Sequence, residues 1–334
     1  MLRRIMLAAT ALVALTAAAS AQNYPWKPEK PITIIVPWAA GGSTDQVTRI
    51  TAAEMEKALG QKIVIVNQPG ASGSIGTRNA MQAPADGYTW TAGAAKDLGT
   101  YIVSGLLDTK ITDWRLYLNV ANVSVLGVHP NTPYKTAQDV VNAMKAKPGQ
   151  VSVATAGINS AGYYAIAGMA NALGVTYKHV SYDGGNPAVI ATVSGETEIT
   201  TQLAVEQAQM IRGKRLRPLA VLSDKPLELA GYGTIPPITA SISGFKPDTN
   251  YFGIFVPKGT PEPVLKTLDM VWNDVVLKSE ALQKYAHANG ALFAPSAGDE
   301  ALKAAMPAIQ VTAWLLQEGG KAKVSPDTVG IPKP

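Results

Sequence analysis

Residues 32–45 read ITIIVPWAAGGSTD and combine an apolar run with a glycine turn. Residues 32–36 form a short, nearly continuous apolar run, which is typical of a strand buried on both faces of a parallel sheet. Pro37 ends this strand because it cannot donate to the ladder. Gly41 and Gly42 then allow the backbone to turn tightly and to approach a neighbour closely.

A helix is predicted directly after this turn. Ser43 or Thr44 can cap its first N–H groups, Asp45 suits its first turn, and Gly60 ends it. A strand, a glycine turn and a helix N-terminus direct unpaired N–H groups to one point, which favours a small anion. Because residues 32–45 contain no Lys or Arg and no phosphate-loop motif, one carboxylate suits the turn better than a phosphate. The alternative is an ordinary strand-to-helix turn with a helix cap.

Residues 1–21 have the pattern of a secretory signal peptide. Arg3 and Arg4 form the basic start, an apolar stretch follows, and Ala19-Ser20-Ala21 is the cleavage motif. The apolar stretch is short for a membrane span, which needs roughly 20 apolar residues. We therefore expect cleavage after Ala21 and an exported protein, with a retained anchor as the alternative.

Composition excludes several classes of function. The chain has no cysteine, so it has neither disulfides nor thiolate metal sites. Its net charge of +5 is mild and no basic cluster is interleaved with aromatic residues, so a nucleic-acid partner is not expected. The three histidines share no metal-ligand spacing and no G-x-S-x-G motif is present. We therefore predict no metal, no cofactor and no catalytic residues.

Strand and helix patterns alternate after the opening turn. Residues 63–66 are expected to form a second buried strand, and residues 88–92 a third, with a helix before each. Such alternation predicts right-handed crossovers and a parallel sheet. Ligands bind beyond the carboxyl ends of such strands, where the loops 37–45, 67–74 and 93–97 would meet.

A second α/β unit follows the first. Residues 121–128 are predicted to be one strand that leaves the first unit, and a glycine turn before residue 161 leads into a helix that ends at residue 173. Residues 252–256 form a strong late strand, so the chain is expected to return to the first unit. The sequence therefore predicts an α/β protein of two lobes, each a mostly parallel sheet flanked by helices, with a cleft and a hinge between them. The predicted limits are residues 22–126 and 246–334 for lobe 1 and residues 127–245 for lobe 2.

Five motifs carry a resemblance to a known family. They are PITIIVPW with GGSTD at residues 31–38 and 41–45, NQPGASGSIG at 67–76, DGYT at 86–89, YDGG at 182–185 and GIFVPKGTP at 253–261. In order and spacing, this set resembles the Bug-type solute-binding receptors of tripartite tricarboxylate transporters. The resemblance implies a periplasmic binding protein fold, similar to type II, that closes on a small organic acid. It also implies a monomer that delivers this acid to two membrane subunits.

The resemblance also implies where the ligand binds. The loop 37–45 and the second-lobe turn from Gly157 to Gly162 would hold a carboxylate through N–H groups, hydroxyls and waters rather than through arginine. Three stretches depart from the family pattern, so the identity of the acid does not carry over: Gly162-Tyr163-Tyr164, Tyr182-Asp183-Gly184 and residues 93–97. The predicted ligand-binding residues are Trp38, Gly41, Gly42, Ser43, Thr44, Asp45, Ser72, Lys96, Gly157, Asn159, Ser160, Tyr163 and Tyr182.

Some of these residues have a second interpretation. Trp38, Tyr163 and Tyr182 either form an aromatic wall, which would suit an aromatic carboxylate, or pack in the core. Lys96 either pairs with a second carboxylate of the ligand or is a solvated lysine at the rim. Asp45 is expected to brace the loop. At the level of function, an exported α/β hydrolase-like enzyme and a purely sensory carboxylate receptor are the alternatives to a transport receptor.

Overall fold

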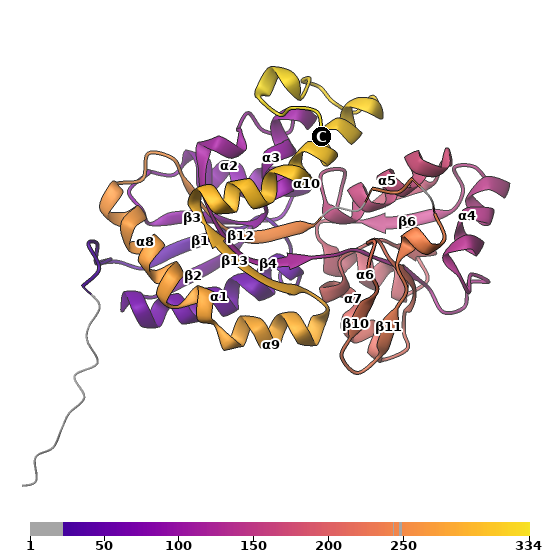
Figure 1. The fold of residues 1–334 in the computed structure, drawn as a ribbon, viewed down its shortest axis with the longest axis horizontal. Helices are drawn as coiled ribbons and strands as arrows, with labels where there is room; N and C mark the ends of the chain where they lie inside the picture. The colour runs from indigo at the N-terminus through magenta and orange to yellow at the C-terminus, as the bar shows by residue number, and fades with distance from the viewer. Residues whose placement is uncertain (1–22, 243, 247–248) are drawn as a thin grey trace, which may run out of the picture.

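The computed structural model describes residues 23–242, 244–246 and 249–334, and the chain forms two α/β lobes (Figure 1). The predicted signal peptide lies outside these residues. The first lobe is built on a six-stranded sheet of order β13-β4-β12-β3-β1-β2, and the second on a five-stranded sheet of order β7-β6-β8-β5-β9. The two-lobed α/β fold is therefore confirmed, whereas the exact lobe limits stay a prediction. Within the described residues, no helix combines the length and apolar character that a bilayer crossing requires.

The first lobe is formed by both ends of the chain. Its N-terminal part contains β1 (Ile32–Val36), α1 (Ser43–Leu59), β2 (Ile63–Asn67), α2 (Ser74–Gln82), β3 (Thr89–Ala94), α3 (Ala95–Ser104) and β4 (Trp114–Asn122). Its C-terminal part contains β12 (Asn250–Pro257), α8 (Glu262–Asp274), α9 (Glu280–Asn289), β13 (Leu292–Ala297) and α10 (Gly298–Glu318).

The second lobe is formed by the middle of the chain. It contains β5 (Val125–Val128), α4 (Ala137–Ala146), β6 (Ser152–Thr155), α5 (Ala161–Leu173), β7 (Lys178–Ser181), α6 (Gly185–Val193), β8 (Ile199–Thr200), α7 (Ala204–Arg212) and β9 (Arg217–Val221). The strands β10 (Leu227–Leu229) and β11 (Gly233–Ile235) form a separate antiparallel hairpin.

The opening unit folds as its sequence predicts. β1 lies between β2 and β3 and is parallel to both, and its Ile34 is fully buried. The helix α1 ends at Gly60, which adopts the left-handed conformation (φ 66°) and donates its N–H to the Glu56 carbonyl. The prediction of a second buried strand is wrong, because β2 is the edge strand of the sheet and Val64 is exposed.

The single strand predicted at residues 121–128 is also wrong. The structure has two strands there, since β4 ends at Asn122 in the first sheet and β5 begins at Val125 in the second. Both strands are buried, so the apolar run does not show where the chain passes from one lobe to the other.

The return strand β12 completes the first sheet. It lies between β3 and β4 and is antiparallel to both; Figure 1 shows β4 running toward the second lobe and β12 beside it running back into the first. A Cβ atom on Gly253 would lie 2.1 Å from the Tyr117 carbonyl oxygen, so only glycine fits at this irregular point of the ladder. The chain therefore passes between the lobes on neighbouring strands.

Candidate functional site

A small cavity of about 30 Å³ lies between the lobes at the start of α1. Lobe 1 contributes the loop that follows β1, and lobe 2 contributes the start of α5 and the α6 and α7 region. The lining residues are Trp38, Gly42, Ser43, Thr44, Asp97, Ala156, Ser160, Ala161, Gly185, Gln202, Leu203, Glu206 and Phe252. The two turns predicted to face one another therefore do so, and five predicted site residues line the cavity: Trp38, Gly42, Ser43, Thr44 and Ser160.

A carboxylate from the second lobe lies at the N-terminus of α1. Glu206 Oε1 accepts hydrogen bonds from the Ser43 N–H at 3.2 Å and from Ser43 Oγ at 2.9 Å. Its Oε2 accepts one from the Leu203 N–H at 3.2 Å. With the Gln202 amide oriented to satisfy both of its ends, that amide donates to Oε2 at 3.0 Å and accepts from the Ala156 N–H at 2.7 Å.

The titratable side chains that line this cavity are acidic. Glu206 and Asp97 line it, and no Lys or Arg is among its described lining residues. Burial raises the pKa of the Glu206 carboxyl, and the hydrogen bonds from Ser43 and Leu203 only partly offset this effect, so the pKa stays above its usual value. The α1 N-terminus thus holds a carboxyl group of the protein itself through N–H and hydroxyl donors.

Asp45 braces the loop from inside α1, as expected. Its Oδ2 accepts from the Gly41 N–H at 2.9 Å, and its two oxygens accept from Arg49 at 3.0 and 2.8 Å. Asn67 Nδ2 donates to Oδ1 at 2.9 Å. Burial raises the pKa of Asp45, but these hydrogen bonds and the Arg49 charge outweigh burial and hold the pKa below its usual value. Gly41 and Asp45 therefore shape the loop without lining the cavity.

Ser72 and Gly157 lie at a close contact between the lobes. A Cβ atom on Gly157, whose φ is +102°, would lie 2.3 Å from Ser72 Oγ. Tyr101 OH donates to the Ser72 carbonyl at 3.1 Å and fixes that side of the contact. These two residues support the interface between the lobes and do not line the cavity.

Asn159 is fully buried and joins the two lobes. Its Nδ2 donates to the Asp97 carbonyl at 3.0 Å, and its Oδ1 accepts from Tyr164 OH and, at 3.3 Å, from Thr100 Oγ1. Because Asp97 and Thr100 lie on α3 of the first lobe, this amide is a latch between the lobes. It also lies outside the cavity lining.

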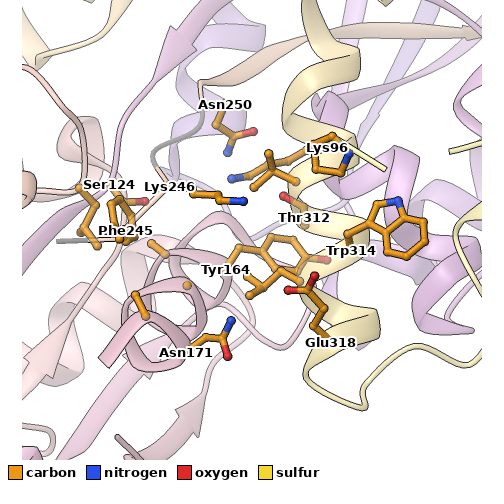
Figure 2. A pocket seen from close by; sticks show the side chains of 18 of the residues that line it. Lys96, Ser124, Tyr164, Asn171, Phe245, Lys246, Asn250, Thr312, Trp314 and Glu318 are labelled. Atoms are coloured by element: carbon orange, nitrogen blue, oxygen red, sulfur yellow. The ribbon is translucent and has the colours of Figure 1, made fainter. Parts of the chain in front are cut away.

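Lys96 lines a different cavity. This second cavity, of about 170 Å³, lies beside the crossing strands and is surrounded by Tyr164, Lys246, Asn250 and other residues of both lobes (Figure 2). Lys96 is buried, and its ammonium lies 5.6 Å from the centre of the Tyr164 ring. The structure therefore places this cation away from the α1 cavity and buries it, so it is not a solvated lysine at the rim, whereas its pairing with a second carboxylate of the ligand stays a prediction.

Tyr163 and Tyr182 also lie away from the α1 cavity. Tyr163 packs against Tyr164 and His179, with ring centres 6.0 and 5.1 Å apart. Tyr182 OH donates to Glu196 Oε1 at 2.7 Å. Of the three predicted aromatic residues only Trp38 lines the cavity, where Phe252 joins it.

Sequence reasoning missed the carboxylates of this site. Glu206 is the third residue of α7 and accepts from the Leu203 N–H, but Leu203 carries no polar capping group that would mark the helix start. Asp97 lies in the loop 93–97, which was expected at the ligand edge of the sheet, but it was not predicted as a site residue. The described residues contain no group of three or more His, Asp or Glu side chains that could hold a metal ion.

Comparison with known proteins identifies the family. Residues 47–315 match the family model described as "Tripartite tricarboxylate transporter family receptor". A Pseudomonas sp. (strain P51) protein, "UPF0065 protein in tcbD-tcbE intergenic region", is 32% identical over 286 residues that cover 84% of each chain.

Solved structures show the same fold. The periplasmic binding protein BugD has a TM-score of 0.80 and 26% identity, and the match covers 88% of this chain and 99% of BugD. MatC from Rhodopseudomonas palustris, solved with bound malate, has a TM-score of 0.76 and 24% identity over 87% of this chain and 98% of MatC. The family that the five sequence motifs predicted is confirmed: this chain belongs to the receptors of the tripartite tricarboxylate transporter family.

Proposed function

We propose that this protein is a periplasmic solute-binding receptor that captures a small organic carboxylate between its lobes and delivers it to the membrane subunits of a tripartite transporter. One observation carries the proposal. The N-terminus of α1 and the start of α5, one from each lobe, face a single cavity in which N–H and hydroxyl groups are the donors. Family membership supports the transport role, and MatC, which has the same fold, was solved with bound malate.

Ligand binding would follow from the helix termini. Ser43 and Thr44 begin α1, and Ser160 caps α5 by accepting from the Tyr163 N–H at 3.3 Å. Hydrogen bonds to a charged carboxylate are stronger than those between neutral groups, and they strengthen further when closure excludes water. An acid that contacts both lobes favours the closed form, which the two membrane subunits would recognise.

A binding assay with product analysis tests this function. The mature protein is titrated with mono-, di- and tricarboxylates, including aromatic ones, by calorimetry and thermal melting, and each mixture is checked for new products by NMR. We expect at least one acid to bind and to raise stability by about 2.7 kcal/mol at a hundredfold excess over its Kd, without turnover. Turnover of any acid would instead favour an exported enzyme.

Two variants locate the site. Ser43→Ala combined with Ser160→Ala should weaken binding and leave unfolding cooperative. The matched control is Ser279→Ala, which removes the cap of α9, where Ser279 Oγ accepts from the Leu282 N–H at 3.0 Å outside the cavity. Equal affinities for the double variant and the control would place the binding site elsewhere.

A further inference from the structure

Glu206 lies where an external carboxylate would have to bind. Its side chain comes from α7 of the second lobe, and its partner Ser43 begins α1 of the first. Four donors reach its two oxygens: the Ser43 N–H and hydroxyl, the Leu203 N–H and the Gln202 amide. A helix N-terminus, a hydroxyl and a second-lobe main-chain donor are the groups that the proposed function assigns to the ligand.

We propose that Glu206 is an internal competitor of the ligand: its carboxylate occupies the anion position at α1 in the unliganded protein, holds the lobes together, and is displaced when a ligand carboxylate binds. The contact between Glu206 and Ser43 is a property of the chain itself. Its displacement rests on the proposed function.

The two carboxylates cannot share the cavity. A volume of about 30 Å³ holds roughly two water molecules, which is less than a dicarboxylate needs. A second carboxylate within hydrogen-bond distance of Glu206 would also place two like charges together, with no Lys or Arg among the described lining residues. Entry of an acid therefore requires that Glu206 leaves its position.

Gly185 makes the internal contact possible. A Cβ atom at this position would lie 2.1 Å from Glu206 Oε1 and 2.2 Å from its Oε2. Because these oxygens end a flexible side chain, a methyl group at position 185 would move the carboxylate rather than the backbone. Gly185→Ala therefore displaces Glu206 from Ser43 and leaves its charge in the protein.

Competition of this kind lowers the apparent affinity of the ligand. A receptor whose binding position is mostly occupied by its own carboxylate binds with an affinity reduced by the fraction that is free. One hydrogen bond to a charged group corresponds to roughly tenfold in an equilibrium constant, so we expect release of Glu206 to strengthen carboxylate binding by roughly that factor. Glu206 would thereby select against acids that bind the α1 terminus weakly.

Distance measurements between the lobes test the internal contact without any ligand. The chain has no cysteine, so Lys57→Cys on α1 and Lys145→Cys on α4, both at exposed positions, accept spin labels specifically. Glu206→Gln and Gly185→Ala should shift the ligand-free distance distribution toward longer values. The control Glu198→Gln changes a carboxylate of the same lobe that accepts from Tyr134 OH at 2.8 Å, and it should leave the distribution unchanged.

Calorimetry then tests the competition. With the acid found to bind the wild type, both variants should bind roughly tenfold more tightly and the control should not. Unchanged distances in both variants would overturn the internal contact, and weaker binding in both would show that Glu206 helps to hold the ligand, as expected for a ligand with an amino or amide group. If no carboxylate binds any variant, the proposed function fails, while the distance data still decide the internal contact. Gly185→Ala retains the carboxylate and serves as the second test if Glu206→Gln does not fold.

Discussion

Removal of the Asn159 side chain should release the two lobes from one another. In Asn159→Ala the Asp97 carbonyl loses the donor at 3.0 Å and Thr100 Oγ1 loses the acceptor at 3.3 Å, and both partners lie on α3 of the first lobe. Asn159 is 0% exposed, so no bulk water replaces these bonds while the lobes stay together. Two hydrogen bonds at about 1 kcal/mol each give a loss of about 2 kcal/mol from the closed form, or roughly 30-fold in the ratio of closed to open protein.

Small-angle scattering and calorimetry measure this change. The ligand-free radius of gyration should increase, and carboxylate affinity should fall by roughly 30-fold because binding must supply the lost closing energy. Asn142→Ala on the exposed face of α4, where Asn142 Oδ1 accepts from Gln138 Nε2, is the matched control. An unchanged radius and an unchanged affinity in folded Asn159→Ala would refute the assignment of this amide as an interlobe latch.

Three further substitutions probe the loop and the helix starts. Asp45→Asn should lower the free energy of unfolding by about 1–2 kcal/mol at neutral pH and by less in acid. The pKa of Asp45 is lowered below 3.8, so ionised Asp45 stabilises the fold above that pH, and this stabilisation is lost as the pH falls through the folded-state pKa. Urea unfolding of the wild type and the variant at neutral and at acidic pH measures the difference. An equal loss of stability at both pH values would contradict the role of the Asp45 charge. Gly76→Ala should lower the free energy of unfolding by about 1–3 kcal/mol and weaken ligand binding. The new methyl would lie 2.7 Å from the Gln68 carbonyl oxygen and 2.9 Å from Pro37 Cα, at the base of the loop before α1. A melting temperature equal to that of the wild type would show that the loop adjusts to the methyl group without loss of stability. Thr136→Ala removes the capping box of α4, so it should lower the free energy of unfolding by about 1 kcal/mol and leave carboxylate affinity unchanged. Thr136→Ser keeps a capping hydroxyl and should restore most of the lost stability in thermal melts.

Local signals explain why the opening unit could be predicted. The apolar run of β1, the capping residues of α1 and the left-handed Gly60 each act over a few residues, so the sequence contains all the information that they need. The division between β4 and β5 could not be predicted in this way. It depends on which sheet each half joins, and a buried apolar run looks the same in either sheet.

The residues of the candidate site also separate into those that local sequence signals mark and those that depend on how the lobes meet. Ser43 and Thr44 were found because the end of a strand and the start of a helix mark them, and Ser160 was placed in the site by the family resemblance; all three line the cavity. Glu206 was missed because its role arises only when α7 of one lobe meets α1 of the other. The burial of Lys96 was missed for a related reason. Its side chain lines the cavity beside the crossing strands, where residues of both lobes meet, and the sequence alone does not show which residues these are.

The place of β12 in the first sheet has a consequence for how the chain acquires its shape. Residues 250–257 supply the strand between β3 and β4, so those two strands keep open edges until the last quarter of the chain is available. The strands of the second lobe all lie between residues 125 and 235 and need nothing from the C-terminus to pair. The lobe that begins the protein is therefore the last to be completed, and during synthesis or export its unpaired edges are the surface most in need of protection from aggregation.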